Sequence, residues 1–513
     1  MAIALGMLPV VTVEAICRWW PPPPIEAVDL TPTTRVDAGP LFIADDADQM
    51  QTDPKRLNFF FPQRFSLAPA AGRIFVIGGS TVAGRPWATE TSMTAWLQSI
   101  LSVQQPDDEF DVVNVGGVSY ASYRLEHLLS EVLNYDPAAV VIYSGHNEFL
   151  ESRTYAAATP ATRSSRLLSS LADRSAFVQR IKHHLARRRR SDHSPESLAA
   201  EVDTRLDHRD GMSKFVRDDW LSRRTVAEFE QTLDRMVKRC RQRNVPVVLC
   251  EPASEIVATP PFKSTLPNDV DLRLPRWQNA TKLQSNLRDL IAERPRRWSS
   301  IETIAKELMR LDPRHADAQH FYAAAKLHRG DAAGLKTHFQ NARDFDVCPL
   351  RATSEIIDAV QNVAKNNEVP LVPTISMLDH RDMDGHRRPD GVADQSYFVD
   401  HVHPTTAAHQ IIARQIYVEL QRLGVAKAKP LRERAIHEAF AAQIAALDEA
   451  YFIRGQQRLE GLRRWARLRS PGSAESSFGP TSAGSSEFDA SATLPLSASP
   501  ETDRNQRTSS DQG

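Results

Sequence analysis

The stretch FVIGGSTVAGRP, residues 75–86, decides how this chain is interpreted. An apolar run leads into paired glycines, a Ser-Thr pair and a third glycine. Gly79 and Gly84 have the spacing of a phosphate-binding loop, but the lysine and hydroxyl residue that must follow are absent, as is a GxGxxG fingerprint. A nucleotide-binding switch is therefore disfavoured. The alternative is that Ser80 is a nucleophile held at the end of a strand.

The strand before Ser80 is one of five apolar runs that we expect to form a single sheet. They cover residues 73–79, 111–117, 138–145, 245–251 and 369–375. Because these runs are nearly continuous in Val, Ile and Leu, they are typical of parallel strands buried on both faces. Amphipathic segments at 225–242 and 354–368, and one from Pro404 to Gly424, supply the covering helices. The pattern predicts a doubly wound α/β sandwich.

Residues with catalytic chemistry follow four of these strands. A Gly-Gly pair begins at Gly116, Asn147 follows the third strand, and Asp400 and His403 lie three apart after the fifth. The carboxyl ends of parallel strands meet at one edge of a sheet, so these residues can converge on Ser80. A serine nucleophile needs a base, an orienting carboxylate and donors for an oxyanion. Each fragment alone is a common turn, cap or surface pair, but their joint appearance in this order is hard to assign to chance.

This set of residues resembles the SGNH hydrolases, also called GDSL-type esterases, over roughly 71–160, 220–260 and 350–424. The resemblance implies a flavodoxin-like three-layer α/β/α sandwich with a five-stranded parallel sheet. It also implies a serine-dependent acyl-ester hydrolase of esterase, lipase or carbohydrate O-deacetylase type, with no cofactor and no metal. The implied roles are Ser80 as nucleophile, His403 as base and acid, Asp400 as its orienting partner, and Ser80, Gly116 and Asn147 as oxyanion donors.

Three positions depart from the family pattern, and one of them, an alanine in place of the glycine usual after DxxH-P-T, should be tolerated inside a helix. Gly79 and Glu148 each replace an aspartate of the family, which leaves the support of their loops open. His146 and His401 flank the motif positions, and we interpret them as loop packing, with a substrate contact as the alternative. The spacing in YFVDHVH also resembles a metal site, but no third group of ligands accompanies it.

The chain divides into six predicted segments. Residues 1–70 are an N-terminal leader with a proline-rich spacer, 71–262 and 350–425 are two parts of the hydrolase domain, and 263–349 are a helical insertion. A helical extension at 426–469 and a disordered tail at 470–513 follow, because the tail has few large apolar residues. The polar stretch 151–215 is predicted to be a helical excursion.

Within the insertion, residues 312–346 resemble one tetratricopeptide repeat, with Gly330-Asp331 at its turn. A single copy favours a helical hairpin docked on the main domain, because stacked repeats need about three copies for stability. The main alternative function depends on this hairpin. It is a catalytically inactive scaffold that binds a protein partner through the insertion.

Composition gives little evidence about partners. The net charge of -1 provides no general affinity for nucleic acid, and four arginines at 187–190 fit a solvated helix end better than an anionic surface contact. Four scattered cysteines indicate neither zinc nor disulfides. The apolar N-terminus is shorter than the roughly 20 residues of a membrane span, so a remnant anchor and a buried or interfacial helix are both open interpretations. A remnant anchor would favour a membrane-associated or extracytoplasmic location over the cytoplasm. The expected partner is an ester substrate, which is a lipid, a small acyl ester or an acetylated carbohydrate.

Overall fold

The computed structural model describes residues 34–36, 39–45, 49–66, 72–151, 196–199, 201–379 and 391–469, and the account below is confined to them. Three of the predicted features lie outside these residues. They are the apolar N-terminus, the arginine run and the tail from residue 470. Most of the predicted excursion at 151–215 also lies outside them, up to residue 195.

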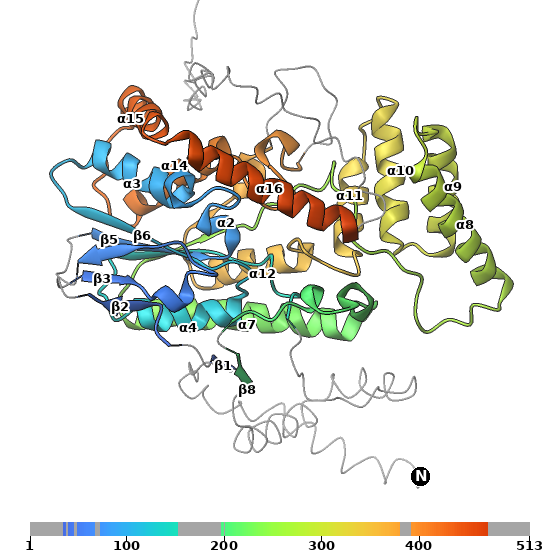
Figure 1. The fold of residues 1–513 in the computed structure, drawn as a ribbon, viewed down its shortest axis with the longest axis horizontal. Helices are drawn as coiled ribbons and strands as arrows, with labels where there is room; N and C mark the ends of the chain where they lie inside the picture. The colour runs from blue at the N-terminus through green and yellow to red at the C-terminus, as the bar shows by residue number, and fades with distance from the viewer. Residues whose placement is uncertain are drawn as a thin grey trace, which may run out of the picture. The chain divides into compact units, whose positions relative to one another are not determined.

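A five-stranded parallel sheet forms the centre of the molecule (Figure 1). Numbered by their order in the chain, its strands run 2-1-3-4-5, which is the flavodoxin-like order. The predicted fold is therefore confirmed. The strands, from one edge to the other, are β6 (Phe110–Gly116), β5 (Gly72–Gly78), β7 (Ala139–Tyr143), β9 (Val247–Cys250) and β10 (Leu371–Val372).

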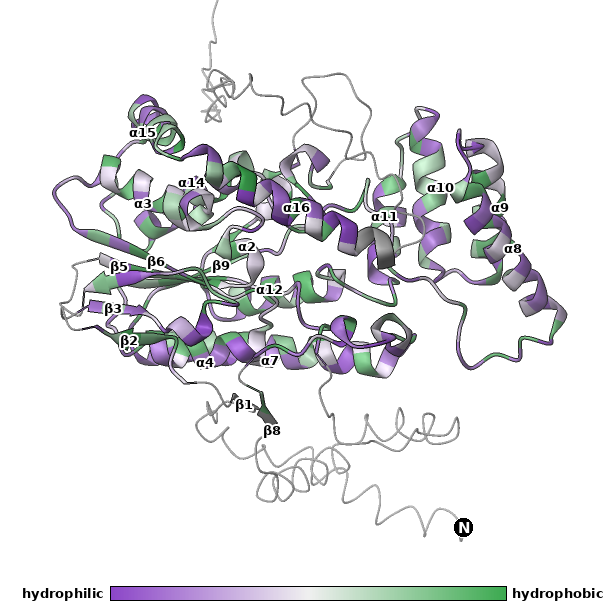
Figure 2. Ribbon diagram, in the orientation of Figure 1, coloured by the Kyte–Doolittle hydropathy of each residue, from purple (hydrophilic) through white to green (hydrophobic). Residues whose placement is uncertain are grey.

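Helices cover both faces of the sheet, which explains why the strands are continuously apolar (Figure 2). In β5, Phe75 and Ile77 join one core while Ile74 and Val76 join the other, and all four are fully buried. The first core is closed by α4 (Ser122–Val132), α7 (Asp219–Gln242) and α12 (Ser354–Asn366). The second is closed by α3 (Met93–Gln104), α14 (Thr406–Arg422) and α15 (Glu433–Ala445).

The three covering helices expected from periodicity are present. α7 begins earlier than the pattern at 225–242 indicates, because the Asp218 carboxylate accepts hydrogen bonds from the first N–H groups of the helix. Thr353 caps α12 in the same way. Gly424, with φ of 72°, follows the end of α14. Burying an apolar side chain on such a face, for example Phe229 of α7, stabilises the fold by roughly 1.5–3 kcal/mol.

Part of the predicted leader at 1–70 is folded, which corrects the sequence interpretation. Strands β2 (Phe42–Ala44), β3 (Gln49–Thr52) and β4 (Arg64–Ser66) form an antiparallel sheet. Phe42 and Phe65 from this sheet are buried in the first core. A further pair of short parallel strands consists of β1 (Thr34–Val36) and β8 (Glu196–Leu198).

Four consecutive helices occupy most of 263–349. They are α8 (Pro275–Ala292), α9 (Trp298–Leu311), α10 (Ala316–His328) and α11 (Leu335–Asp344). α8, α9 and α10 share a core of their own that is rich in leucine and alanine. The turn between α10 and α11 contains Gly330 in the left-handed region, φ 83°, as the hairpin interpretation requires. The likeness to a tetratricopeptide repeat stays a prediction.

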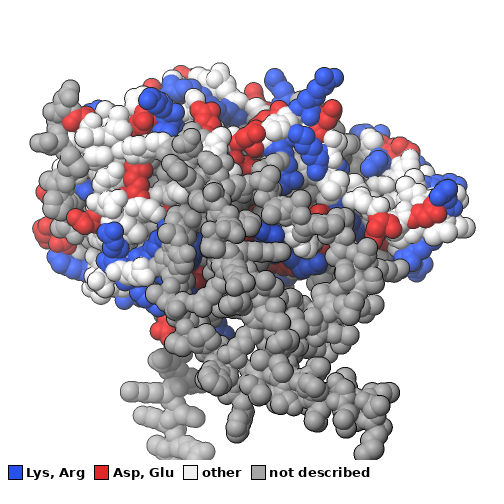
Figure 3. Space-filling model, turned by 90° about the horizontal axis from the view of Figure 1, so that it is seen from below, with Lys and Arg blue, Asp and Glu red and all other residues white. Residues whose placement is uncertain are grey.

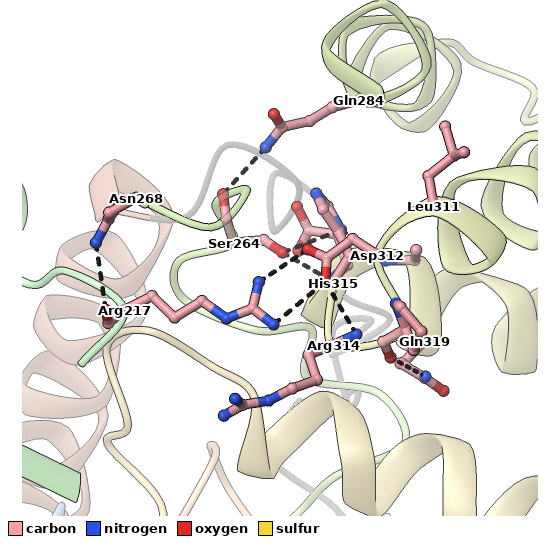
Figure 4. A network of polar contacts seen from close by, with 12 residues as sticks. Arg217, Ser264, Asn268, Gln284, Leu311, Asp312, Arg314, His315 and Gln319 are labelled. Carbon is pink, nitrogen blue, oxygen red and sulfur yellow. Dashed lines mark hydrogen bonds and ion pairs between the residues drawn. The ribbon is translucent and has the colours of Figure 1, made fainter. Parts of the chain in front are cut away.

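A polar network attaches this insertion to the segment before α7 (Figure 4). The Arg217 guanidinium donates to both carboxylate oxygens of Asp312, at 2.9 and 3.2 Å. Asn268, also in the insertion, donates to the Arg217 carbonyl at 3.2 Å. Because the Arg217–Asp312 pair is bidentate and mostly buried, it fixes the relative orientation of the two segments as well as the distance between them.

The predicted C-terminal extension at 426–469 contains α15 and the long helix α16 (Glu449–Arg469). In the part of the chain that the structure describes, no helix has both the length and the apolar character needed to cross a membrane. Acidic and basic side chains are interspersed over the described surface visible in Figure 3, as the near-zero net charge leads one to expect.

Candidate active site

Ser80 lies at the carboxyl end of β5, where the strand turns directly into the one-turn helix α2 (Ser80–Ala83). Gly79 is the residue before the helix, and Gly84 ends it in the left-handed conformation, φ 89°. As the first residue of the helix, Ser80 has an N–H with no partner inside the helix. The side chain is half-buried. The position is also next to the point where strand order reverses, between β5 and β7, where sheets of this type bind ligands.

His403 and Asp400 complete a chain of hydrogen bonds with Ser80. His403 Nε2 is 2.8 Å from Ser80 Oγ, and His403 Nδ1 is 2.6 Å from Asp400 Oδ2. Asp400 and His403 are only 6% and 5% exposed, whereas Ser80 remains partly accessible. Three residues from opposite ends of the chain are thus aligned from carboxylate to hydroxyl.

The Asp400 carboxylate is held in its charged form. Burial acts to raise its pKa, but His403 and His401 and the hydrogen bonds it accepts lower that pKa well below the usual range. Its Oδ1 accepts the backbone N–H groups of Val402 and His403, both at 2.9 Å. These bonds fix the carboxylate in the turn, so its other oxygen points at the imidazole.

Asn147 follows β7 and approaches the turn that carries Ser80. Its Nδ2 donates to the Tyr120 carbonyl at 3.0 Å, which leaves its second hydrogen available. A Cβ added to Gly79 would lie 2.7 Å from this Nδ2, too close for a real contact. Gly79 therefore allows the amide to approach, which accounts for the absence of a larger residue there.

Gly116 does not have the position expected of an oxyanion donor, which corrects the sequence interpretation. Its N–H donates to Asn114 Oδ1 at 2.9 Å, and a Cβ at this residue would meet the Ala83 backbone. Three residues further on, Ser119 has φ of 63°, an uncommon value for a non-glycine residue. Among the described residues, the Ser119 N–H has no hydrogen-bond acceptor. Asn147 donates to the carbonyl of the next residue, Tyr120, so its amide lies against the Tyr120–Ala121 peptide, one residue beyond Ser119.

Glu148, the second departure from the family pattern, has a clear local role. Its carboxylate accepts from the Ser122 N–H at 3.0 Å and from the Ser122 hydroxyl at 2.7 Å, at the start of α4. A negative charge is favourable at a helix N-terminus. Close by, Arg124 forms a buried bidentate pair with Glu151 at 2.7 Å. This ion pair fixes the loop after Asn147, and it was not predicted from the sequence.

The other histidines near the site are packed and uncharged. Burial lowers the pKa of His146 to about 3 and that of His401 to about 4. His146 Nδ1 accepts the Ala352 N–H at 3.2 Å, and the His401 ring lies edge-on to Phe262. The packing interpretation is therefore supported for both. Over the described ranges, no three His, Cys, Asp or Glu residues gather in a way that could hold a metal ion.

No protein-family model matches the sequence. No curated protein matches it either. The solved structures that it resembles include GDSL-type lipolytic hydrolases and acetylxylan esterases. The likeness, with TM-scores of 0.30 or less in the three examples that follow, carries no activity over to this chain.

Three of these structures illustrate the likeness. A GDSL-like lipase from Bacteroides thetaiotaomicron is 10% identical, with a TM-score of 0.28, over 69% of this chain and 89% of the lipase. A lipase/acylhydrolase from Enterococcus faecalis is 14% identical, with a TM-score of 0.29, over 69% and 96%. A catalytic mutant of an acetylxylan esterase from Geobacillus stearothermophilus is 13% identical, with a TM-score of 0.30, over 68% and 94%.

Proposed function

We propose that this protein is a serine-dependent acyl-ester hydrolase of the SGNH type. The observation that carries the proposal is the continuous chain of hydrogen bonds from Asp400 through His403 to Ser80. A serine hydroxyl is a weak nucleophile unless a base takes its proton, and an imidazole performs that role when a carboxylate fixes its tautomer and orientation. The His403 imidazole lies within hydrogen-bonding distance of both the Ser80 hydroxyl and the Asp400 carboxylate, which supports these roles.

The proposed reaction begins when His403 Nε2 takes the hydroxyl proton while Ser80 Oγ bonds to the ester carbonyl carbon. The tetrahedral intermediate collapses as its bond to the alcohol oxygen breaks, and His403 returns the proton to that oxygen. Water then attacks the acyl-enzyme by the same route and releases the acid. Throughout, Asp400 remains ionised and stabilises the imidazolium, in agreement with its lowered pKa.

The negative charge that develops on the carbonyl oxygen requires donors fixed in advance. In this proposal two of them are the Ser80 N–H and the Asn147 amide. The third is the Ser119 N–H, in place of Gly116, whose own N–H is already bonded. Losing one such donor typically costs about 3 kcal/mol of transition-state stabilisation.

The test is labelling of the purified protein with a fluorescent fluorophosphonate. We expect the wild type to be labelled and Ser80→Ala and His403→Ala to be unlabelled. Ser376→Ala, which removes an exposed serine hydroxyl near the end of β10, is the matched control and should label normally. Labelled protein would then be assayed on lipid esters, short acyl esters and acetylated sugars. A folded wild type that takes no label would refute the proposal and favour the inactive scaffold.

A further inference from the structure

The helix α16 packs onto the loop that follows the candidate nucleophile (Figure 1). The Tyr451 hydroxyl lies 2.8 Å from Thr91 Oγ1, and a Cβ at Gly455 would lie 2.2 Å from the Trp87 ring. One turn further along the helix, Arg458 donates to the Trp87 carbonyl at 3.1 Å. The helix is therefore in close contact with this loop along one of its sides.

This packing places two arginines at one aromatic ring. The guanidinium carbon of Arg85 is 5.1 Å from the centroid of Phe61, and that of Arg458 is 5.6 Å from the same centroid. Among the described residues, no carboxylate forms an ion pair with either guanidinium. Burial lowers the pKa of Arg85, and the like charge of Arg458 lowers it further.

The arginine pair is costly for the free protein. Arg85 Nε is shielded from solvent and has no hydrogen-bond partner. A buried donor without a partner and two neighbouring like charges both destabilise the folded state. A bound anion would offset the repulsion between the two like charges, because a guanidinium can donate two parallel hydrogen bonds to a carboxylate or a phosphate.

The pair is also close to the reacting groups. The backbone N–H of Arg85 donates to the backbone carbonyl of Ser80 at 3.1 Å, so Arg85 follows the candidate nucleophile after about one helical turn. On the other side, the Phe59 carbonyl accepts the Val118 N–H at 2.9 Å, which joins the segment containing Phe61 to the loop that carries Ser119. The arginines thus border both loops of the candidate site.

We infer that Arg85 and Arg458 form a subsite for an anionic group on the substrate, so that the preferred ester carries a carboxylate or phosphate near its scissile bond. This inference depends on the proposed ester hydrolysis for its setting. The hydrolase class by itself includes neutral lipids, acyl esters and acetylated sugars, and the arginine pair narrows that range.

The kinetic test compares pairs of esters in which one member carries an anionic group that the other lacks. The first pair is para-nitrophenyl hexanoate and the para-nitrophenyl monoester of adipic acid. The second is an acetylated xylo-oligosaccharide and an acetylated oligogalacturonide, and an acetylated glycerol phosphate compared with acetylglycerol covers phosphate. In at least one pair we expect kcat/KM to favour the anionic ester by about tenfold or more, because a hydrogen bond to a charged group contributes enough free energy for a change of that size. The preference should decrease as salt is added.

The matched variants are Arg85→Gln and Arg458→Gln, with Arg464→Gln as the control, because Arg464 is exposed on the same helix. Both test variants should reduce the anionic preference toward one, while the control keeps it. Thermal melting checks folding, and Arg85→Lys, which keeps the charge without the planar fork, substitutes for Arg85→Gln if that variant unfolds. A wild type without preference in any pair, or a preference unchanged in both test variants, would overturn the inference.

A binding measurement separates this inference from the proposed function. Calorimetric titration of Ser80→Ala with the anionic and neutral members of each pair needs no turnover. Tighter binding of the anionic member that Arg458→Gln abolishes supports the subsite. If the wild-type protein nevertheless hydrolyses no ester, the proposed function fails and the anion subsite stands. Equal binding of both members, with ester hydrolysis intact, overturns the subsite alone.

Discussion

Gly79→Ala is the sharpest test of where the oxyanion binds. The added Cβ would lie 2.7 Å from Asn147 Nδ2, a distance that real Cβ atoms do not tolerate, so the amide must move away. The backbone at Gly79, with φ of -86° and ψ of -155°, suits alanine, so little strain arises in the turn itself. If the Asn147 amide is an oxyanion donor, its displacement should cost about 3 kcal/mol, a fall of 10²–10³ in kcat.

The measurement is kcat with para-nitrophenyl acetate for Gly79→Ala, Asn147→Ala and the double variant. Each single variant should lose activity by a similar factor. The double variant should lose no more than Asn147→Ala, because alanine at 147 removes the atom with which the new methyl collides. Melting temperatures of all three should stay close to that of the wild type. A Gly79→Ala enzyme with kcat within about threefold of wild type, or additive losses, would refute this placement of the amide.

Three further predictions concern catalysis, stability and packing. Asp400→Asn should lower kcat by about ten-thousandfold with the fold retained, since the imidazole loses its orienting partner; a small loss in steady-state assays would exclude the triad. Burial lowers the pKa of His409 to about 3, so as pH falls below 6.5 this residue binds a proton in the unfolded protein before it does so in the folded one. The free energy of unfolding therefore decreases by about 1.4 kcal/mol per pH unit. In urea titrations, His409→Phe should therefore depend less on pH than wild type between pH 6 and 4, and equal slopes would contradict this. Gly455→Ala should lower the melting temperature because its Cβ meets the Trp87 ring at 2.2 Å, whereas Gly461→Ala, with open space around it, should not.

Much of the site was predictable because parallel strands impose a rule on position. Ser80, Asn147 and His403 are far apart in sequence, but each follows a strand whose carboxyl end lies at the same edge of the sheet. The strands themselves were recognisable from continuous apolar runs, which are typical of a sheet buried on both faces. Residue chemistry and strand order together were enough to indicate a common site.

The remaining details depend on tertiary contacts that leave little trace in sequence. Gly116 seemed the natural donor because glycine exposes its backbone, yet a neighbouring side chain, Asn114, takes its N–H. The positive φ falls instead at Ser119, a residue type with no special preference for that conformation. The small N-terminal sheet was missed for another reason. Strands of three or four residues such as β3, with the sequence QMQT, are too short for a periodic signal.

The placement of the C-terminal helix was equally hidden. A helical extension at 426–469 was predicted, but the partners of its helix are fixed by contacts such as that of Gly455 with Trp87, which are far apart in sequence. No local pattern specifies such a pairing. The arginine pair at Phe61 follows from that packing, and it too becomes visible only in three dimensions.

The insertion between β9 and β10 also has a consequence for how the chain folds. Leu371 and Val372 pair with Leu249 and Cys250, so the edge of the sheet closes only across the whole insertion. Helices α8, α9 and α10 make mostly local contacts around a core of their own, and such contacts form quickly. Loop-closure entropy opposes the pairing of β10 with β9 until these helices have brought the two ends of the insertion together. We therefore expect β10, only two residues long, to join the sheet late in folding, with the last turn of the catalytic apparatus, Asp400 to His403, ordering after it.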